Sequence, residues 1–197
     1  MVKKYLVEAL GTFALTLVVA LSIVVKFPVA TPILAALTLG LFVYSVGHIS
    51  GAHINPAVTI GLWSIKKIKT NEVLFYMVAQ FVGAGIAMMI VSYTVGLATL
   101  TVSNSLLIGF AEALGTFFFT FGITSVVYGK AHSVMSGIVI GGSLLLGIAM
   151  AAMFGSNGVL NPAVAFGIGS FGWMYVLGPV VGSIAGMQAY KYLMGSA

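Results

Sequence analysis

The tetrapeptide Asn-Pro-Ala-Val occurs twice in this chain, at residues 55–58 and again at 161–164. Asn is a favoured N-cap residue, and Pro is favoured at the first helical position because the N–H that it lacks would have no intrahelical partner there. Each copy therefore predicts the start of a helix, one at Pro56 and one at Pro162. A single Asn-Pro pair usually marks only a turn or a cap, so the significance of this motif comes from its repetition.

The sequence around the motif repeats as well. Residues 8–13 read Glu-Ala-Leu-Gly-Thr-Phe and recur identically at residues 112–117, 104 positions later. The two Asn-Pro motifs are 106 positions apart, so both repeats have nearly the same offset. An internal repeat of this size predicts two homologous halves, residues 1–100 and 101–197, within a single domain of residues 1–197.

The composition indicates a lipid environment. Hydrophobic residues make up 60% of the 197 residues and charged residues only 6%, whereas about a quarter of the residues in ordinary soluble proteins are charged. Residues 131–190 contain no Lys, Arg, Asp or Glu. The chain has no cysteine, which excludes disulfides and thiolate metal sites. We expect an integral membrane protein without a metal or cofactor, and no nucleic-acid partner.

Apolar runs between charged and turn residues predict six membrane-spanning helices, because one span needs about 20 apolar residues. The helices that begin at Pro56 and Pro162 have room for about ten residues, or roughly 15 Å, which is half of the bilayer core. The predicted fold class is therefore an all-α membrane protein with six transmembrane helices and two re-entrant half-helices. The predicted spans are residues 5–25, 33–50, 73–97, 105–128, 133–154 and 171–194.

The number of spans in each half determines how the halves are related. Each half contains three spans, an odd number, so the second half enters the membrane from the opposite side and the chain is an inverted 3+3 repeat. If the N-terminus is cytoplasmic, seven of the eight lysines are cytoplasmic and only Lys26 is external. The positive-inside rule then predicts cytoplasmic N- and C-termini, and we expect the plasma membrane.

Two half-helices that enter from opposite faces should meet near the middle of the membrane. Each helix N-terminus contributes about +0.5 of an elementary charge, which opposes cations and protons but not neutral solutes. The side-chain amides of Asn55 and Asn161 would be the hydrogen-bond donors beside this point. This arrangement predicts a passive pore for neutral molecules.

Three features of the chain carry a family resemblance: the Glu near the start of each half, the paired Asn-Pro-Ala triplets, and the stretch Gly-His-Ile-Ser-Gly-Ala-His-Ile-Asn-Pro-Ala-Val-Thr at residues 47–59. In these features the chain resembles the aquaporin and glycerol-facilitator family. The resemblance implies a homotetrameric channel, not an enzyme, that passes water or small uncharged solutes. It implies that Glu8 and Glu112 accept hydrogen bonds from the exposed backbone beside the half-helices. We expect His53 to face the cytoplasmic vestibule. The pore motifs implied are Asn55, Pro56, Ala57, Asn161, Pro162 and Ala163.

The chain departs from the family pattern at the outer filter. Family members usually have an arginine directly after the second triplet, but this position is Val164 and the chain contains no arginine. Counting along the sequence places the other filter residues at Ala35, Ala149 and Gly158. Four small apolar residues predict a wide, apolar filter that passes neutral solutes at least as large as urea or glycerol. The Asp common in glycerol facilitators is Ala165 here, so that subfamily is not directly supported.

Two other functions are compatible with the sequence. Secondary transporters also use inverted repeats and broken helices, but this interpretation requires an ion-coupling cluster, and the spans offer only Glu8 and Glu112. A non-conducting structural membrane protein could keep the same scaffold while its apolar ring stays dry. In that case Met153 or Phe154 would fill the space of the missing arginine.

Overall fold

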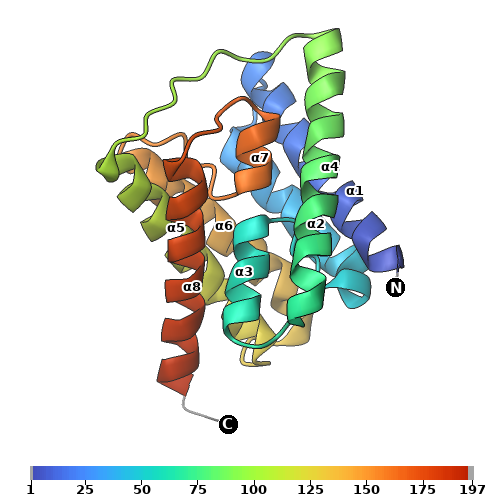
Figure 1. Ribbon diagram of the computed structural model, residues 1–197, viewed down its shortest axis with the longest axis vertical. Helices are drawn as coiled ribbons and strands as arrows, with labels where there is room; N and C mark the ends of the chain where they lie inside the picture. The colour runs from blue at the N-terminus through green and yellow to red at the C-terminus, as the bar shows by residue number, and fades with distance from the viewer. Residues whose placement is uncertain (1, 195–197) are drawn as a thin grey trace.

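The computed structural model describes residues 2–194, and this part of the chain is helical, without β-strands. Six long helices and two short ones form a single bundle (Figure 1). A turn of 3₁₀-helix at Ser133–Met135 precedes α6. The α-helices are α1 (Val2–Val24), α2 (Thr31–Ser50), α3 (Pro56–Ser64), α4 (Thr70–Thr94), α5 (Leu106–Val127), α6 (Ser136–Met153), α7 (Pro162–Gly167) and α8 (Met174–Met194).

The long helices correspond to the six predicted spans. Helices α1, α2, α4, α5 and α6 are long and apolar enough to cross a bilayer. Helix α8 has a similar length of 21 residues, but it is less apolar because it contains several Gly and Tyr residues together with Gln188 and Lys191. It packs along α5 and α3, as the last long helix of the bundle.

The two short helices lie between α4 and α8, one above the other (Figure 1). Helix α3 ends at Ser64, one residue before the end predicted from the sequence. Helix α7 has six residues, so the prediction of about ten was too long. The chain leaves the helix early because Gly169 adopts the left-handed conformation, with φ of 77°, and the Ser170 N–H donates to the carbonyl of Ala165.

Glycines allow the long helices to approach closely. A Cβ on Gly83 of α4 would overlap the carbonyl oxygen of Ala9 on α1, and a Cβ on Gly182 of α8 would overlap the carbonyl oxygen of Ala113 on α5. These two contacts occupy equivalent places in the two halves. Small residues at such crossings bring helix backbones into direct contact, which is a common way for membrane helices to associate.

This packing predicts opposite effects for two glycine substitutions. Gly182→Ala should lower the melting temperature of the purified protein, because overpacking typically costs about 1–3 kcal/mol. Gly142→Ala on α6, where a new Cβ meets no atom within 4 Å, should leave it unchanged or slightly raised, since Ala is the better helix former. Thermal unfolding in detergent followed by tryptophan fluorescence measures both. Equal effects of the two substitutions would contradict the proposed close contact.

Candidate pore

The two Asn-Pro motifs meet inside the bundle and are joined by reciprocal hydrogen bonds. Asn55 caps α3 by accepting from the N–H of Ala57 at 2.8 Å, and its Nδ2 donates to the carbonyl of Leu160 at 2.9 Å. Asn161 caps α7, and its Nδ2 donates to the carbonyl of Ile54 at 2.9 Å. Each amide oxygen must face the helix N–H groups, so the amide orientation is fixed and one Nδ2 hydrogen of each Asn is left for another partner.

Two buried glutamates hold the segments that lead into the short helices. Glu8 accepts from the N–H groups of His53 at 2.9 Å and Ile54 at 2.6 Å. Glu8 also accepts from the Ser50 hydroxyl at 2.7 Å and from Gln80 Nε2 at 2.8 Å. Two of these four donors are backbone N–H groups, so the carboxylate supports the segment that leads into α3.

Glu112 has the equivalent role in the second half. It accepts from the N–H groups of Val159 at 3.0 Å and Leu160 at 2.7 Å, and from the Ser156 hydroxyl. Both glutamates are completely buried. Because an unpaired N–H group at membrane depth is costly, these carboxylates replace the water that would otherwise solvate the two irregular segments.

The residues immediately before the two asparagines are in an unfavourable conformation. Ile54 has φ of 53° and Leu160 has φ of 56°, so both lie in the left-handed region that residues with a Cβ rarely adopt. Such a residue costs about 1–3 kcal/mol and persists only where the surroundings enforce it. Here the enforcing contacts are the hydrogen bonds from the N–H groups of these two residues to Glu8 and Glu112.

An apolar cavity of about 260 Å³ lies on one side of the paired asparagines. Asn55 and Asn161 both face it, and each is only 3% exposed. The wall opposite them is formed by aliphatic and aromatic side chains of α1, α2, α5 and α6. We call this space the outer cavity. It presents few hydrogen-bonding groups apart from the two asparagines, His53, Thr31 and Asn157.

The outer cavity contains three of the four residues predicted for the filter. Ala35, Gly158 and Val164 line it, but Ala149 does not. On α6 the residues that line the cavity are Ile148 and Ala152, one helical turn apart, and Ile148 is the neighbour of the predicted Ala149. Ile148 also packs against Gly158, where an added Cβ would lie 2.9 Å from the Ile148 carbonyl oxygen.

Sequence reasoning missed several wall residues, which are related in pairs by the offset of the repeat. Leu15 on α1 and Phe119 on α5 are 104 residues apart, the same offset as the Glu-containing repeat, and both line the outer cavity. Leu39 on α2 and Leu144 on α6 form a second pair of lining residues, 105 positions apart. These residues belong to long apolar helices, so nothing in their local sequence distinguishes a pore-facing position from a packed one.

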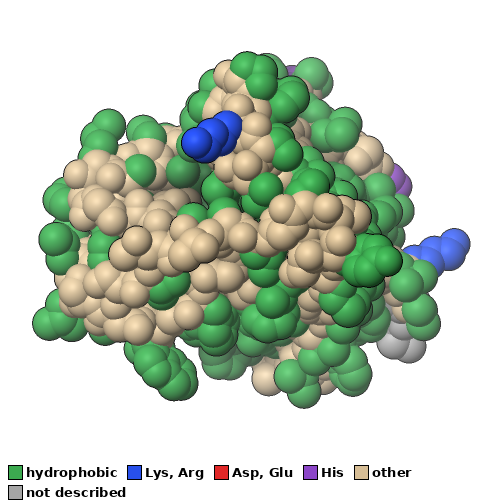
Figure 2. Space-filling model, turned by 90° about the horizontal axis from the view of Figure 1, so that it is seen from above, with side chains coloured by type: hydrophobic (Ala, Val, Ile, Leu, Met, Phe, Trp, Pro, Cys, Tyr) green, Lys and Arg blue, Asp and Glu red, His purple; other side chains and the backbone are tan. Residues whose placement is uncertain are grey.

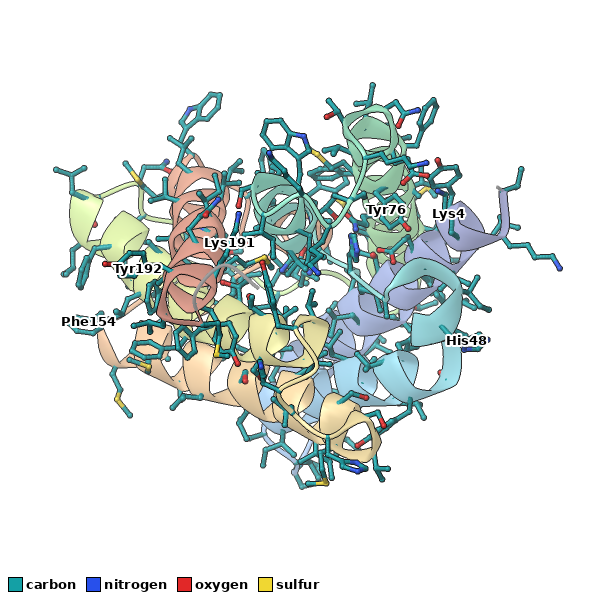
Figure 3. The ribbon with its side chains drawn as sticks, turned by 90° about the horizontal axis from the view of Figure 1, so that it is seen from below. Lys4, His48, Tyr76, Phe154, Lys191 and Tyr192 are labelled. Atoms are coloured by element: carbon teal, nitrogen blue, oxygen red, sulfur yellow. The ribbon has the colours of Figure 1, made fainter. Side chains whose placement is uncertain are left out.

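A second cavity, of about 480 Å³, lies on the side of the chain termini. This inner cavity is more polar, and its lining includes His48, Ser50, Lys67, Glu72 and Tyr76. Viewed from that end, Tyr76 lies beside Lys4 (Figure 3), whose ammonium group is 5.7 Å from the tyrosine ring and forms a salt bridge with Glu72.

His53 lies where the two cavities meet. His53, Leu39 and Phe119 line both of them. The Nδ1 atom of His53 is 3.1 Å from the Thr59 hydroxyl, and its ring packs on Tyr76 with centroids 4.7 Å apart. The predicted vestibule residue is therefore held in place at the junction, beside Asn55. The two cavities are therefore adjacent, and these three side chains lie between them.

The α4–α5 connection covers the far end of the outer cavity. It crosses the top of the bundle in an extended conformation (Figure 1), and Leu100 from this connection lines the cavity. Asn157 fixes it by donating from Nδ2 to the carbonyl of Thr101 at 3.1 Å and to the Ser170 hydroxyl at 2.8 Å. The surface seen from this end shows no acidic side chain (Figure 2).

Comparisons with known proteins agree with this geometry. The family described as Major intrinsic protein matches residues 1–190. The chain is 39% identical over 182 residues to the probable aquaporin AqpM of Archaeoglobus fulgidus, covering 80% of this chain and 73% of that protein. It is 31% identical over 215 residues to aquaporin NIP1-1 of Arabidopsis thaliana, covering 96% of this chain and 73% of that protein.

A solved structure also resembles this fold. The aquaglyceroporin from Plasmodium falciparum matches with a TM-score of 0.74 over 96% of this chain and 95% of that chain. The sequence identity of that match is 23%, so the likeness supports the fold and not the choice of permeant.

The support of the re-entrant backbone by Glu8 can be tested by substitution. Glu8→Gln replaces one acceptor oxygen with a donor that faces buried donors, so we expect a loss of about 1–3 kcal/mol of stability. Glu72→Gln is the matched control, because it removes the same charge from a partly exposed salt bridge that contributes little. Thermal unfolding in detergent compares the variants. A Glu8 variant as stable as the Glu72 variant would contradict this role.

Proposed function

We propose, from the premise that this chain belongs to the major intrinsic protein family, that its inner and outer cavities form one pore through which permeants pass the paired asparagines. The chain is a passive membrane channel for water or small solutes and not an enzyme. The observation that carries the proposal is the position of Asn55 and Asn161 on the cavity wall, each with an amide hydrogen to offer. A passing molecule can replace its lost water contacts with these two donors.

The outer filter that we propose consists of Ala35, Ile148, Gly158 and Val164, which all line the outer cavity. None of them carries a charge or a polar side chain. Ile148 makes the filter narrower than an alanine at that place would, but no cationic side chain crosses the opening at Val164. The filter therefore selects by size and by the cost of removing water from the solute, which is high for groups that find no replacement hydrogen bond.

The permeants that fit this lining are water and neutral solutes of the size of ammonia, urea or glycerol. Cations are opposed by the N-termini of α3 and α7, which meet at the asparagines and carry partial positive charge. Exclusion of protons depends on the same two helix N-termini, since Val164 adds no positive charge. The barrier to ions therefore consists of the two helix N-termini alone, without the further repulsion that a cationic filter residue would add.

We further infer how the protein sits in the membrane. The lysine distribution supports cytoplasmic N- and C-termini, with only Lys26 at the opposite side, and we infer the plasma membrane as the location. Glu8 and Glu112 accept equivalent hydrogen bonds in the two halves, and Asn55 and Asn161 donate equivalent ones. This equivalence supports the division into inverted halves at residues 1–100 and 101–197. The family resemblance supports a homotetramer in which each chain has its own pore.

The filter is tested by placing a cation in it. In liposomes that contain the native chain, gradients of water, urea, glycerol and ammonia should all cause swelling or shrinkage. Val164→Arg should lower glycerol and urea permeability by roughly tenfold, equivalent to about 1.4 kcal/mol of added barrier, because the guanidinium narrows the opening. Water permeability should fall less, since water is smaller. Stopped-flow light scattering measures all four rates.

The matched control is Ala149→Val, which enlarges a neighbouring side chain on α6 that does not face the cavity. It should leave every rate unchanged, whereas Ile148→Ala should raise glycerol permeability. If the arginine variant transported all solutes like the native chain, Val164 would not line the route. If no variant, the native chain included, passed any solute faster than empty liposomes, the pore proposal itself would fail.

A further inference from the structure

The turn between α3 and α4 carries a basic groove on the outside of the bundle. The groove is open, with a volume of about 910 Å³, and its lining includes Lys66, Lys67 and Lys69. All three lysines are exposed. The turn connects the end of a half-helix to the start of a spanning helix, so it lies at the depth of the lipid headgroups on the side of the chain termini.

The acidic group in this groove is already neutralised. Glu72 lines it as well, but its carboxylate forms the salt bridge with Lys4, the only salt bridge among residues 2–194. Lys67 is partly engaged, because its ammonium group lies 4.6 Å from the centre of the Tyr128 ring. Lys66 and Lys69 remain available, and the groove therefore has a net positive charge.

An apolar groove of about 500 Å³ runs along α4 from the same end. Its residues on α4 recur every three or four positions, so they form one stripe on the helix, and Phe166 of α7 forms the opposite wall. From Leu74 to Gly85 the stripe is about 16 Å long at 1.5 Å per residue, which matches one half of a bilayer core of about 30 Å. The α4 residues are Leu74, Met77, Val78, Phe81, Val82 and Gly85.

The basic and apolar grooves follow one another along α4. Thr70 lines the basic groove and lies one helical turn before Leu74, the first residue of the apolar stripe. Trp63 at the end of α3 donates from Nε1 to the Thr70 hydroxyl at 3.0 Å and is 44% exposed. Trp is the side chain most suited to the boundary between headgroups and acyl chains. From the headgroups inward, this surface thus presents positive charge, then an interfacial Trp, and then an apolar groove as long as one leaflet is thick.

We propose that this surface is a specific site for an anionic phospholipid of the leaflet on the side of the chain termini. Lys66 and Lys69 bind the headgroup phosphate, and one acyl chain lies in the groove between α4 and Phe166. The position of the site gives it a structural consequence, because Trp63 belongs to the half-helix α3 that Asn55 caps inside the pore. A bound lipid therefore stabilises the helix that carries one of the two pore asparagines. The proposed lipid site does not depend on which solute passes through the pore.

The headgroup contact is tested with the full chain in detergent micelles. Phosphatidylglycerol should raise the melting temperature and appear as a bound lipid in native mass spectrometry, whereas phosphatidylcholine should do so only weakly. The double variant Lys66→Gln/Lys69→Gln should weaken phosphatidylglycerol binding by about five-fold for each lysine lost. Lys3→Gln/Lys130→Gln removes the same charge from exposed lysines outside the groove and should leave binding unchanged.

The acyl contact needs a second pair of variants. Gly85→Leu fills the end of the apolar groove, and a Cβ at this position makes only ordinary contact with Phe166 at 3.7 Å. It should weaken phosphatidylglycerol binding without lowering the stability of the lipid-free protein. Gly142→Leu, which adds the same side chain in open space on α6, is its control.

Three results would overturn the lipid site. Equal loss of binding in both double lysine variants would mean that only the general surface charge attracts the lipid. Stabilisation of the same size by inorganic phosphate or glycerol phosphate would mean a free-anion site without a role for the acyl chain. Unchanged binding in Gly85→Leu would remove the apolar groove from the site. Liposome transport by these variants is measured separately, so failure of the lipid site is distinguishable from failure of the pore.

Discussion

The structure depends on satisfying backbone N–H groups where no water is available to do so. Two segments leave the helical conformation inside the bundle, and each exposes N–H groups that a lipid environment would leave unpaired. Glu8 and Glu112 accept these bonds, while Asn55 and Asn161 bond to the carbonyls of the opposite segment. The same contacts enforce the left-handed conformation of Ile54 and Leu160. Removing one partner therefore affects both the fold and the shape of the pore.

The two halves share this plan but differ in polarity. In the first half the supporting shell includes His53, Thr59 and Gln80, and Gln80 Nε2 donates to both Glu8 and the Thr59 hydroxyl. The offset of 106 residues pairs His53 with Val159 and Thr59 with Ala165. At these two positions the first half therefore has polar side chains and the second half has apolar ones.

The two ends of the proposed pore therefore differ in polarity. The inner cavity presents hydroxyl, imidazole, ammonium and carboxylate groups, whereas the outer cavity is walled mainly by aliphatic side chains. In the pore that we propose, a solute passes from the more polar inner cavity to the apolar outer cavity, which the paired asparagines line. The cost of removing water from the solute is then concentrated at the outer cavity, where Val164 offers no side-chain hydrogen bond.

The sequence by itself determined the membrane environment, the eight helices and the pairing of the two Asn-Pro motifs, because hydropathy, N-cap chemistry and an exact repeat are local or countable signals. It did not determine the length of α7, which a glycine turn shortened, nor which face of α6 lines the cavity, where Ile148 and not the adjacent Ala149 is a lining residue. It also gave no sign that Leu15, Leu39 and Phe119 face the pore. In a helix that is apolar all round, the side that faces the pore is decided by how neighbouring helices pack, and only the tertiary structure contains that information.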